Sequence, residues 1–155
     1  MAYVPFVISG ARIQRATSFI FILASVGLTG CTSTTEILIG TIGDTMSYDK
    51  TILEVKAESK IKLTLKNNAT SPAMQHDFVL VNPGTENEVG LAGLGAGPSK
   101  DYIPDSPHVL AHTRLLKPGE SDTITFTAPA KAGDYPYLCT FPGHFAVMKG
   151  TLKVK

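Results

Sequence analysis

The sequence has little charge, little cysteine and no long apolar run. Only 17% of its 155 residues are charged, and the 14 basic and 13 acidic side chains nearly cancel; soluble proteins average about 25%. This balance offers neither the basic excess typical of nucleic-acid-binding proteins nor an acidic tail. The length suits one packed domain better than two. The two cysteines, Cys31 and Cys139, allow one disulfide or two unrelated roles, and their surroundings must decide.

The N-terminal segment has the charged-then-apolar order of a secretory signal. Residues 1–30 hold no acidic side chain, and Arg12 and Arg15 precede an uncharged stretch over 16–30 rich in Phe, Ile, Leu and Val. The stretch is shorter than the roughly 20 apolar residues that span a bilayer. It ends at Leu28-Thr29-Gly30-Cys31, which resembles the bacterial lipobox, where a lipid-modified cysteine becomes the first mature residue.

We therefore expect a lipoprotein signal peptide over residues 1–30, with Cys31 as the lipidation site and a tether and first strand over 31–45. An uncleaved N-terminal membrane helix, with Cys31 a bystander, is the alternative. In both cases the remaining chain is held to a membrane on the exported side. We expect the outer face of the cytoplasmic membrane, facing the periplasm or the exterior. Cleavage would leave 125 residues with a formal charge of −1.

The rest of the chain alternates apolar and polar residues over short runs, which predicts strands. The predicted strands cover residues 52–55, 61–66, 78–81, 123–127, 135–138 and 150–154. Several short strands separated by proline and glycine predict a two-sheet sandwich or a barrel. Closely spaced glycines and prolines over 84–113 predict an irregular excursion with one helical turn.

One group of residues near the C-terminus carries metal chemistry. Cys139, His144 and Met148 lie on one loop between two predicted strands, and His76 precedes the apolar run that begins at Phe78. Two imidazoles, a thiolate and a weak thioether form the ligand set that copper favours for electron transfer. Zinc sites use a further thiolate, a further histidine or an open water position and have no use for methionine. Each residue alone is compatible with ordinary core packing, but the set predicts copper.

These motifs resemble those of the cupredoxins, in the branch of the azurins and auracyanins. The matching segments are Cys139-Thr-Phe-Pro-Gly-His144, Met148-Lys-Gly-Thr-Leu, His76-Asp-Phe-Val-Leu-Val-Asn, Pro104-Asp-Ser-Pro and Lys117-Pro-Gly-Glu-Ser. The resemblance is closest to the auracyanins and covers residues 46–155. It implies an all-β, cupredoxin-like Greek-key sandwich of about eight strands that holds one type 1 copper ion.

The resemblance also implies roles for individual residues. His76, Cys139 and His144 would be the equatorial copper ligands and Met148 the long axial ligand, with the backbone carbonyl of Gln75 on the opposite axial side. In this family two backbone N–H groups bond the cysteine sulfur, and such donors tune the potential.

The matching donors here are Asp77 and Phe141. Pro142 has no N–H and would keep the loop dry and stiff. An apolar docking patch is expected around His144, the ligand nearest the solvent, although core packing is the alternative for some members. The patch would comprise Met74, Phe141, Pro142 and Phe145.

Several features depart from the family pattern. Asp77 stands where asparagine is usual, and we expect its charge to lower the reduction potential. Pro136 should leave its strand bulged or unpaired. His108 and His112 lie four apart, which on a helix would allow a second metal site, but the resemblance gives them no role and we expect solvated loop histidines. The azurin disulfide has no counterpart, because Cys139 is the only cysteine after Cys31.

The expected function is that of a monomeric, membrane-tethered electron carrier without catalytic activity. The redox partners implied are a quinol-oxidising complex or reaction centre and a cytochrome c or oxidase, with no nucleic acid and no small-molecule substrate. Copper storage or delivery by a lipoprotein is the alternative, although delivery sites usually favour exposed methionine and histidine clusters without a buried thiolate. A metal-free adhesion-like sandwich would leave the ligand loop unexplained.

Overall fold

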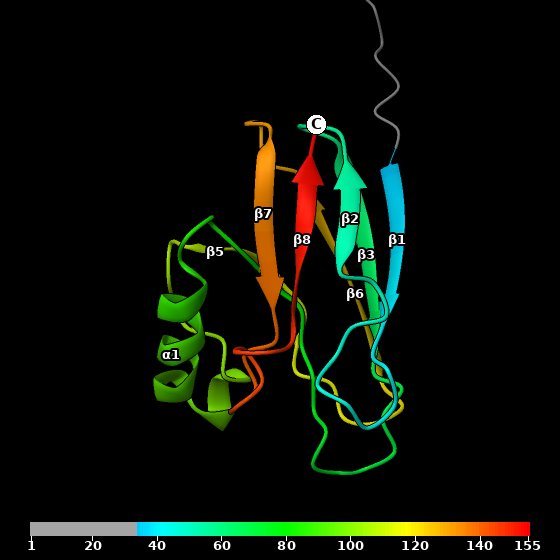
Figure 1. Cartoon of the computed structure of the whole chain (residues 1–155), viewed down its shortest axis with the longest axis vertical. Coiled ribbons are helices and arrows are strands. Elements are labelled where there is room, and N and C mark those ends of the chain that lie inside the picture. The colour runs from blue at the N-terminus through cyan, green and yellow to red at the C-terminus, as the bar shows by residue number, and fades with distance from the viewer. Residues whose placement is uncertain (1–33) are drawn as a thin grey trace, which may run out of the picture. The chain divides into compact units, whose positions relative to one another are not determined.

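The computed structural model describes residues 34–155, so the predicted signal peptide and Cys31 lie outside the described residues. Eight strands form two sheets (Figure 1). The three-stranded sheet has the order β1–β3–β6, formed by Thr34–Gly40, Lys60–Lys66 and Ser121–Thr127. The five-stranded sheet has the order β2–β8–β7–β4–β5, formed by Ile52–Val55, Lys149–Val154, Gly133–Leu138, Val79–Val81 and Val109–His112. The predicted all-β sandwich is therefore confirmed.

Strand β3 shows why the sheets pack against each other. Its sequence alternates lysine or threonine with Ile61, Leu63 and Leu65, and these three side chains are fully buried. Because successive side chains of a strand point to opposite faces, all three face the second sheet. The pairing of β3 with β1 is parallel and that with β6 is antiparallel.

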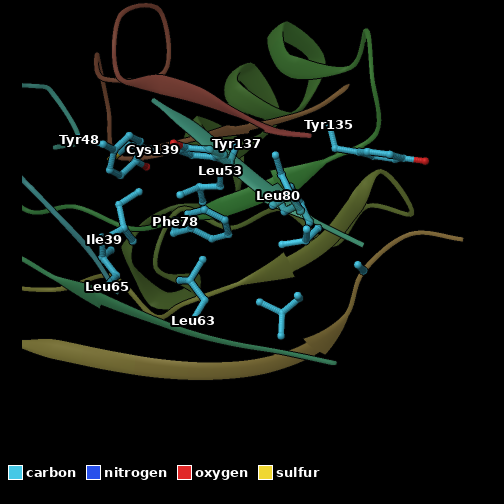
Figure 2. Packing of buried hydrophobic residues seen from close by; sticks show 14 of the residues in the cluster. Ile39, Tyr48, Leu53, Leu63, Leu65, Phe78, Leu80, Tyr135, Tyr137 and Cys139 are labelled. Atoms are coloured by element: carbon cyan, nitrogen blue, oxygen red, sulfur yellow. The ribbon is translucent and has the colours of Figure 1, made fainter. Parts of the chain in front are cut away.

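The core between the sheets is built around two aromatic rings. Phe78 and Tyr137 stack with ring centroids 4.9 Å apart, and Figure 2 shows them close to Leu63 and Leu53. Tyr48 packs edge-on against Tyr137 at 5.3 Å. Cys139 belongs to this buried cluster and lies at its edge beside Tyr48 (Figure 2). The predicted copper loop thus begins inside the apolar core.

Pro136 interrupts strand β7 less than expected. The register of β7 with β8 runs unbroken, with Pro136 opposite Thr151. The N–H of Thr151 donates to the carbonyl of Thr51 at 2.8 Å, on the side away from β7. Pro136 therefore occupies a position where β8 requires no hydrogen bond from it. On the other side, the pairing with β4 ends at Tyr137. The expected bulge was wrong, and the strand is unpaired at Pro136 only on the β4 side.

The excursion over 84–113 is more ordered than expected. It contains helix α1 (Glu86–Ala96), the 3₁₀ turn η1 (Pro98–Lys100) and strand β5, so the expectation of a single helical turn was wrong. Three glycines weaken α1 by about 1 kcal/mol each relative to alanine. Close packing compensates for this loss of helix stability. The ring of Phe145 lies so near Gly90 that an added Cβ would be only 2.4 Å from it. In Figure 1, α1 lies beside the lower end of β7, where the copper loop begins.

Candidate metal centre

The predicted ligands come from two segments that the five-stranded sheet brings together. His76 stands just before β4 and is fixed by two backbone hydrogen bonds with Leu116, at 3.1 and 2.8 Å. Cys139 directly follows β7, which pairs with β4. His76 and Cys139 are therefore carried at the same end of two adjacent strands, and both are fully buried.

The loop from Cys139 to Met148 is closed by its own backbone. The N–H of Cys139 donates to the carbonyl of Met148 at 3.0 Å. Inside the loop, the N–H of His144 donates to Phe141 and the N–H of Met148 donates to His144, at 2.9 and 2.8 Å. These bonds fold the loop back on itself, so that Met148 is fully buried in the same cluster as Cys139.

The donor atoms of His76, Cys139 and His144 converge on one point. The Sγ atom of Cys139 lies 3.5 Å from Nδ1 of His144 and 3.9 Å from Nδ1 of His76, and the three donors all lie within 4.8 Å of one another. A sulfur and a nitrogen bound to one metal at about 2.3 and 2.0 Å in a trigonal arrangement would be about 3.7 Å apart. The observed separations therefore fit a shared metal ion.

The electrostatics of the three groups also suit a metal. Burial lowers the pKa of His76 to about 4 and lowers that of His144, so both imidazoles are neutral at pH 7 and keep a lone pair for a ligand bond. Burial, reinforced by the nearby Asp77 carboxylate, raises the pKa of Cys139 well above its usual value. Without a cation this sulfur is a thiol, and metal binding must release its proton.

The backbone beside the sulfur partly offsets the effect of burial. The N–H groups of Asp77 and Phe141 act to lower the pKa of Cys139. The carboxylate of Asp77 is fully buried, and desolvation raises its pKa to about 6. Its two oxygens accept hydrogen bonds from the N–H and the hydroxyl of Thr140, at 2.7 and 2.6 Å.

Three residues that support the site were missed by sequence reasoning. The Tyr48 hydroxyl donates to the carbonyl of Asp77 at 2.6 Å. Thr140 holds the Asp77 side chain, as described above. The Asn67 amide donates to the carbonyls of Met74 and Leu116 at 2.8 and 3.0 Å. Only Thr140 left a signal in the sequence, because it lies between Cys139 and Phe141.

Residues of the expected docking patch differ in exposure. Met74, Gln75, Phe141 and Pro142 are partly exposed, and the neighbouring Val147 is 61% exposed. Phe145 is also partly exposed, but one side of its ring packs against Gly90 of α1. His144 itself is 5% exposed, whereas the other three predicted ligands are fully buried.

The pair His108 and His112 does not lie on a helix. His112 is the last residue of strand β5, and its Nδ1 lies 3.0 Å from the carbonyl oxygen of Thr113. His108 lies 3.6 Å from a carboxylate oxygen of Glu88 on α1. The expectation of loop residues was therefore wrong for His112. Over residues 34–155, the only group of three or more histidine, cysteine or acidic side chains placed to hold a metal is His76, Cys139 and His144.

The sandwich and the converging sulfur and imidazole donors, together with Met148, define a type 1 copper protein with the cupredoxin fold. Comparison with known families agrees. The family described as copper binding proteins, plastocyanin/azurin family, matches residues 35–155, and the chain belongs to it.

Auracyanins and azurins are among the proteins that resemble this chain. Auracyanin-A of Chloroflexus aurantiacus is 41% identical over 119 residues, which cover 75% of this chain and 72% of that protein. Azurin of Bordetella pertussis is 41% identical over 117 residues, covering 72% and 78%. The solved structure of auracyanin A, described as a "blue" copper protein, superposes with a TM-score of 0.74 at 39% identity, over 79% of this chain and all of that one.

Proposed function

We propose that the protein is a blue copper electron carrier that is lipid-anchored to the outer face of the cytoplasmic membrane and does not catalyse a reaction. The observation that carries the electron-transfer proposal is the convergence of one sulfur and two imidazole nitrogens of buried residues within 4.8 Å of one another. The family match to copper binding proteins and the auracyanin relatives support it.

Copper bound at this centre supplies a one-electron Cu(II)/Cu(I) couple. The protein holds the ligands rigidly, because His76 is fixed to Leu116 and Cys139 to Met148 by backbone hydrogen bonds. A rigid ligand set changes little between the two oxidation states. The N–H groups of Asp77 and Phe141 stabilise negative charge on the sulfur. His144, the only predicted side-chain ligand with measurable exposure, would be the point where electrons enter and leave.

The partners proposed are redox proteins: a quinol-oxidising complex or reaction centre on one side and a cytochrome c or oxidase on the other. The apolar side chains near His144, including Val147, suit docking to a complementary apolar surface. With a formal charge near zero, long-range steering would contribute little to this docking.

A single spectrum tests the copper proposal. The copper-loaded protein is expected to be intensely blue when oxidised and to bleach reversibly when reduced. Cys139→Ser should remove the colour, while His112→Gln, a histidine outside the site, should keep it. A colourless protein, or one that yields its copper readily to a chelator, would instead favour copper storage or delivery.

The anchor needs a separate test, because Cys31 lies outside the described residues. Over residues 34–155 no helix is long and apolar enough to cross a membrane. We expect the full chain to incorporate labelled fatty acid and to sediment with membranes. Cys31→Ala should abolish the labelling, and Cys139→Ser should leave it intact. Fatty-acid labelling that persists in Cys31→Ala would contradict the lipidation site.

A further inference from the structure

The turn after η1 has an unfavourable backbone at two successive residues. Asp101 and Tyr102 have φ values of +53° and +59°, in a region that L-residues rarely adopt. Aspartate tolerates this region better than most residues, but for a bulky residue it is a strained conformation. Backbone bonds keep the turn in place, with the N–H of Tyr102 donating to Gly97 at 2.9 Å. Strain that persists at a defined position points to a function for that position.

Helix α1 leaves room for this turn. A Cβ added to Gly93 would lie 2.5 Å from the carbonyl oxygen of Tyr102 and 3.3 Å from Cβ of Thr140. The glycine therefore lets α1 approach the Tyr102 backbone and the copper loop at the same time. Any larger residue at position 93 would separate the helix from one or the other.

The ring of Tyr102 reaches the copper site through one intermediate. It packs edge-on against Phe141 with centroids 5.5 Å apart and planes at 83°. Phe141 in turn packs against the ring of His144 at 4.9 Å and 60°. The backbone N–H of Phe141 also acts to lower the pKa of Cys139. Phe141 thus packs against one predicted ligand and influences the charge on another, and Tyr102 packs against its ring.

We propose that Tyr102 is a positioning residue for the metal centre that acts through Phe141. Its ring holds the Phe141 ring against His144, and this keeps the Phe141 N–H directed at the Cys139 sulfur. The strained turn is retained because a relaxed backbone would move the Tyr102 ring off Phe141. This inference rests on the proposed blue copper function.

Three variants of the full chain distinguish the effect of the Tyr102 ring from the effect of the strained backbone. Tyr102→Gly removes the ring while suiting the positive φ, so the variant is expected to fold. Tyr102→Phe keeps the ring without the hydroxyl. Asp101→Gly relieves strain at the neighbouring residue and leaves the ring in place, which makes it the matched control. Unfolding of each metal-free variant, followed by circular dichroism, reports on folding independently of copper.

We expect Tyr102→Gly to release Cu(I) to a chelator roughly tenfold faster, the lower end of the effect typical of removing a group that orients a ligand. Its reduction potential should fall, because a weakened N–H bond to sulfur stabilises the electron-rich reduced state less. Tyr102→Phe and Asp101→Gly should match the wild type in both measurements, and Asp101→Gly should unfold at a higher temperature.

Unchanged release and potential in Tyr102→Gly would overturn the proposal. An equal change in Asp101→Gly would also overturn it, because the effect would then come from the backbone. An equal change in Tyr102→Phe would overturn it too, because the effect would then come from the hydroxyl. The wild-type spectrum separates this test from the function itself. If the copper-loaded wild type is not blue, the proposed function fails first, whatever the variants do.

Discussion

The carboxylate of Asp77 accepts two hydrogen bonds from Thr140, one from its backbone N–H at 2.7 Å and one from its hydroxyl at 2.6 Å. These bonds join the residue that follows one predicted ligand, His76, to the residue that follows another, Cys139. Both partners are fully buried. The pair therefore fixes the two ligand-bearing segments relative to each other, and it does so with a group that can carry charge.

The charge of Asp77 is expected to lower the reduction potential. Asparagine at this position could still accept from the Thr140 N–H and would carry no charge, so Asp77→Asn should raise the potential. A nearby unit charge at an effective dielectric constant of about 20 contributes a few kcal/mol, which corresponds to a rise on the order of 100 mV. Voltammetry of both proteins at pH 8 measures it. An unchanged or lower potential would refute the role of the charge.

The hydroxyl of Thr140 is expected to contribute to stability. Thr140→Val keeps the shape of the side chain and leaves one buried oxygen of Asp77 without its partner, which should cost about 1–3 kcal/mol of unfolding free energy. Urea unfolding of the metal-free protein measures the loss. Thr123→Val is the control, because its hydroxyl bonds Thr64 at an exposed site and its removal should cost less than about 0.5 kcal/mol. Equal losses in the two variants would contradict the prediction.

The stability of the metal-free protein is expected to depend on pH through two opposing groups. His76 has a pKa of about 4 in the fold against 6.5 as a free side chain, so its contribution of about 3 kcal/mol is present above pH 6.5 and lost as pH falls toward 4. The pKa of Asp77 is raised from 3.8 to about 6, so the folded state takes up a proton at Asp77 more readily than the unfolded state. The contribution of Asp77 to the free energy of unfolding therefore increases as the pH falls from 6 toward 4. The two effects partly cancel between pH 6 and 4.

Asp77→Asn removes the opposing group. The metal-free variant should therefore be more stable than the wild type at pH 7 and should lose stability more steeply between pH 6 and 4. Urea unfolding at several pH values measures both slopes. If the variant and the wild type show the same slope, Asp77 does not titrate as its burial implies.

The sequence carried enough information to predict the ligand loop because its chemistry is local. Cys139, His144 and Met148 lie within ten residues, between strands β7 and β8. His76 could be added because it lies two residues before the continuous apolar run that begins at Phe78. The partners of Asp77 were harder to predict from the sequence. Tyr48 contacts Asp77 from 29 positions away in the chain, and no local pattern marks such a contact.

Helix α1 was missed for a related reason. Its glycines are poor helix formers, and it has no apolar stripe of the usual spacing. The helix forms because Gly90 and Gly93 allow close contact with Phe145 and Thr140, which come from the copper loop some fifty residues later. Closely spaced glycines predict a loop from the local sequence, but here they permit a helix to pack against a distant segment of the chain.

The close approach at Gly90 yields a further prediction. Gly90→Ala would place a Cβ 2.4 Å from the Phe145 ring, so either α1 or the copper loop must move. Overpacking of this kind typically costs about 1–3 kcal/mol. Gly95→Ala lies on the same helix with nothing within 4 Å of the added Cβ, and it should stabilise the protein by about 1 kcal/mol. Thermal unfolding of the metal-free variants measures both changes. Because Gly90 contacts the loop and Gly95 does not, only Gly90→Ala of these two variants should also speed copper release to a chelator. If both substitutions stabilise the protein and leave copper release unchanged, α1 does not brace the loop.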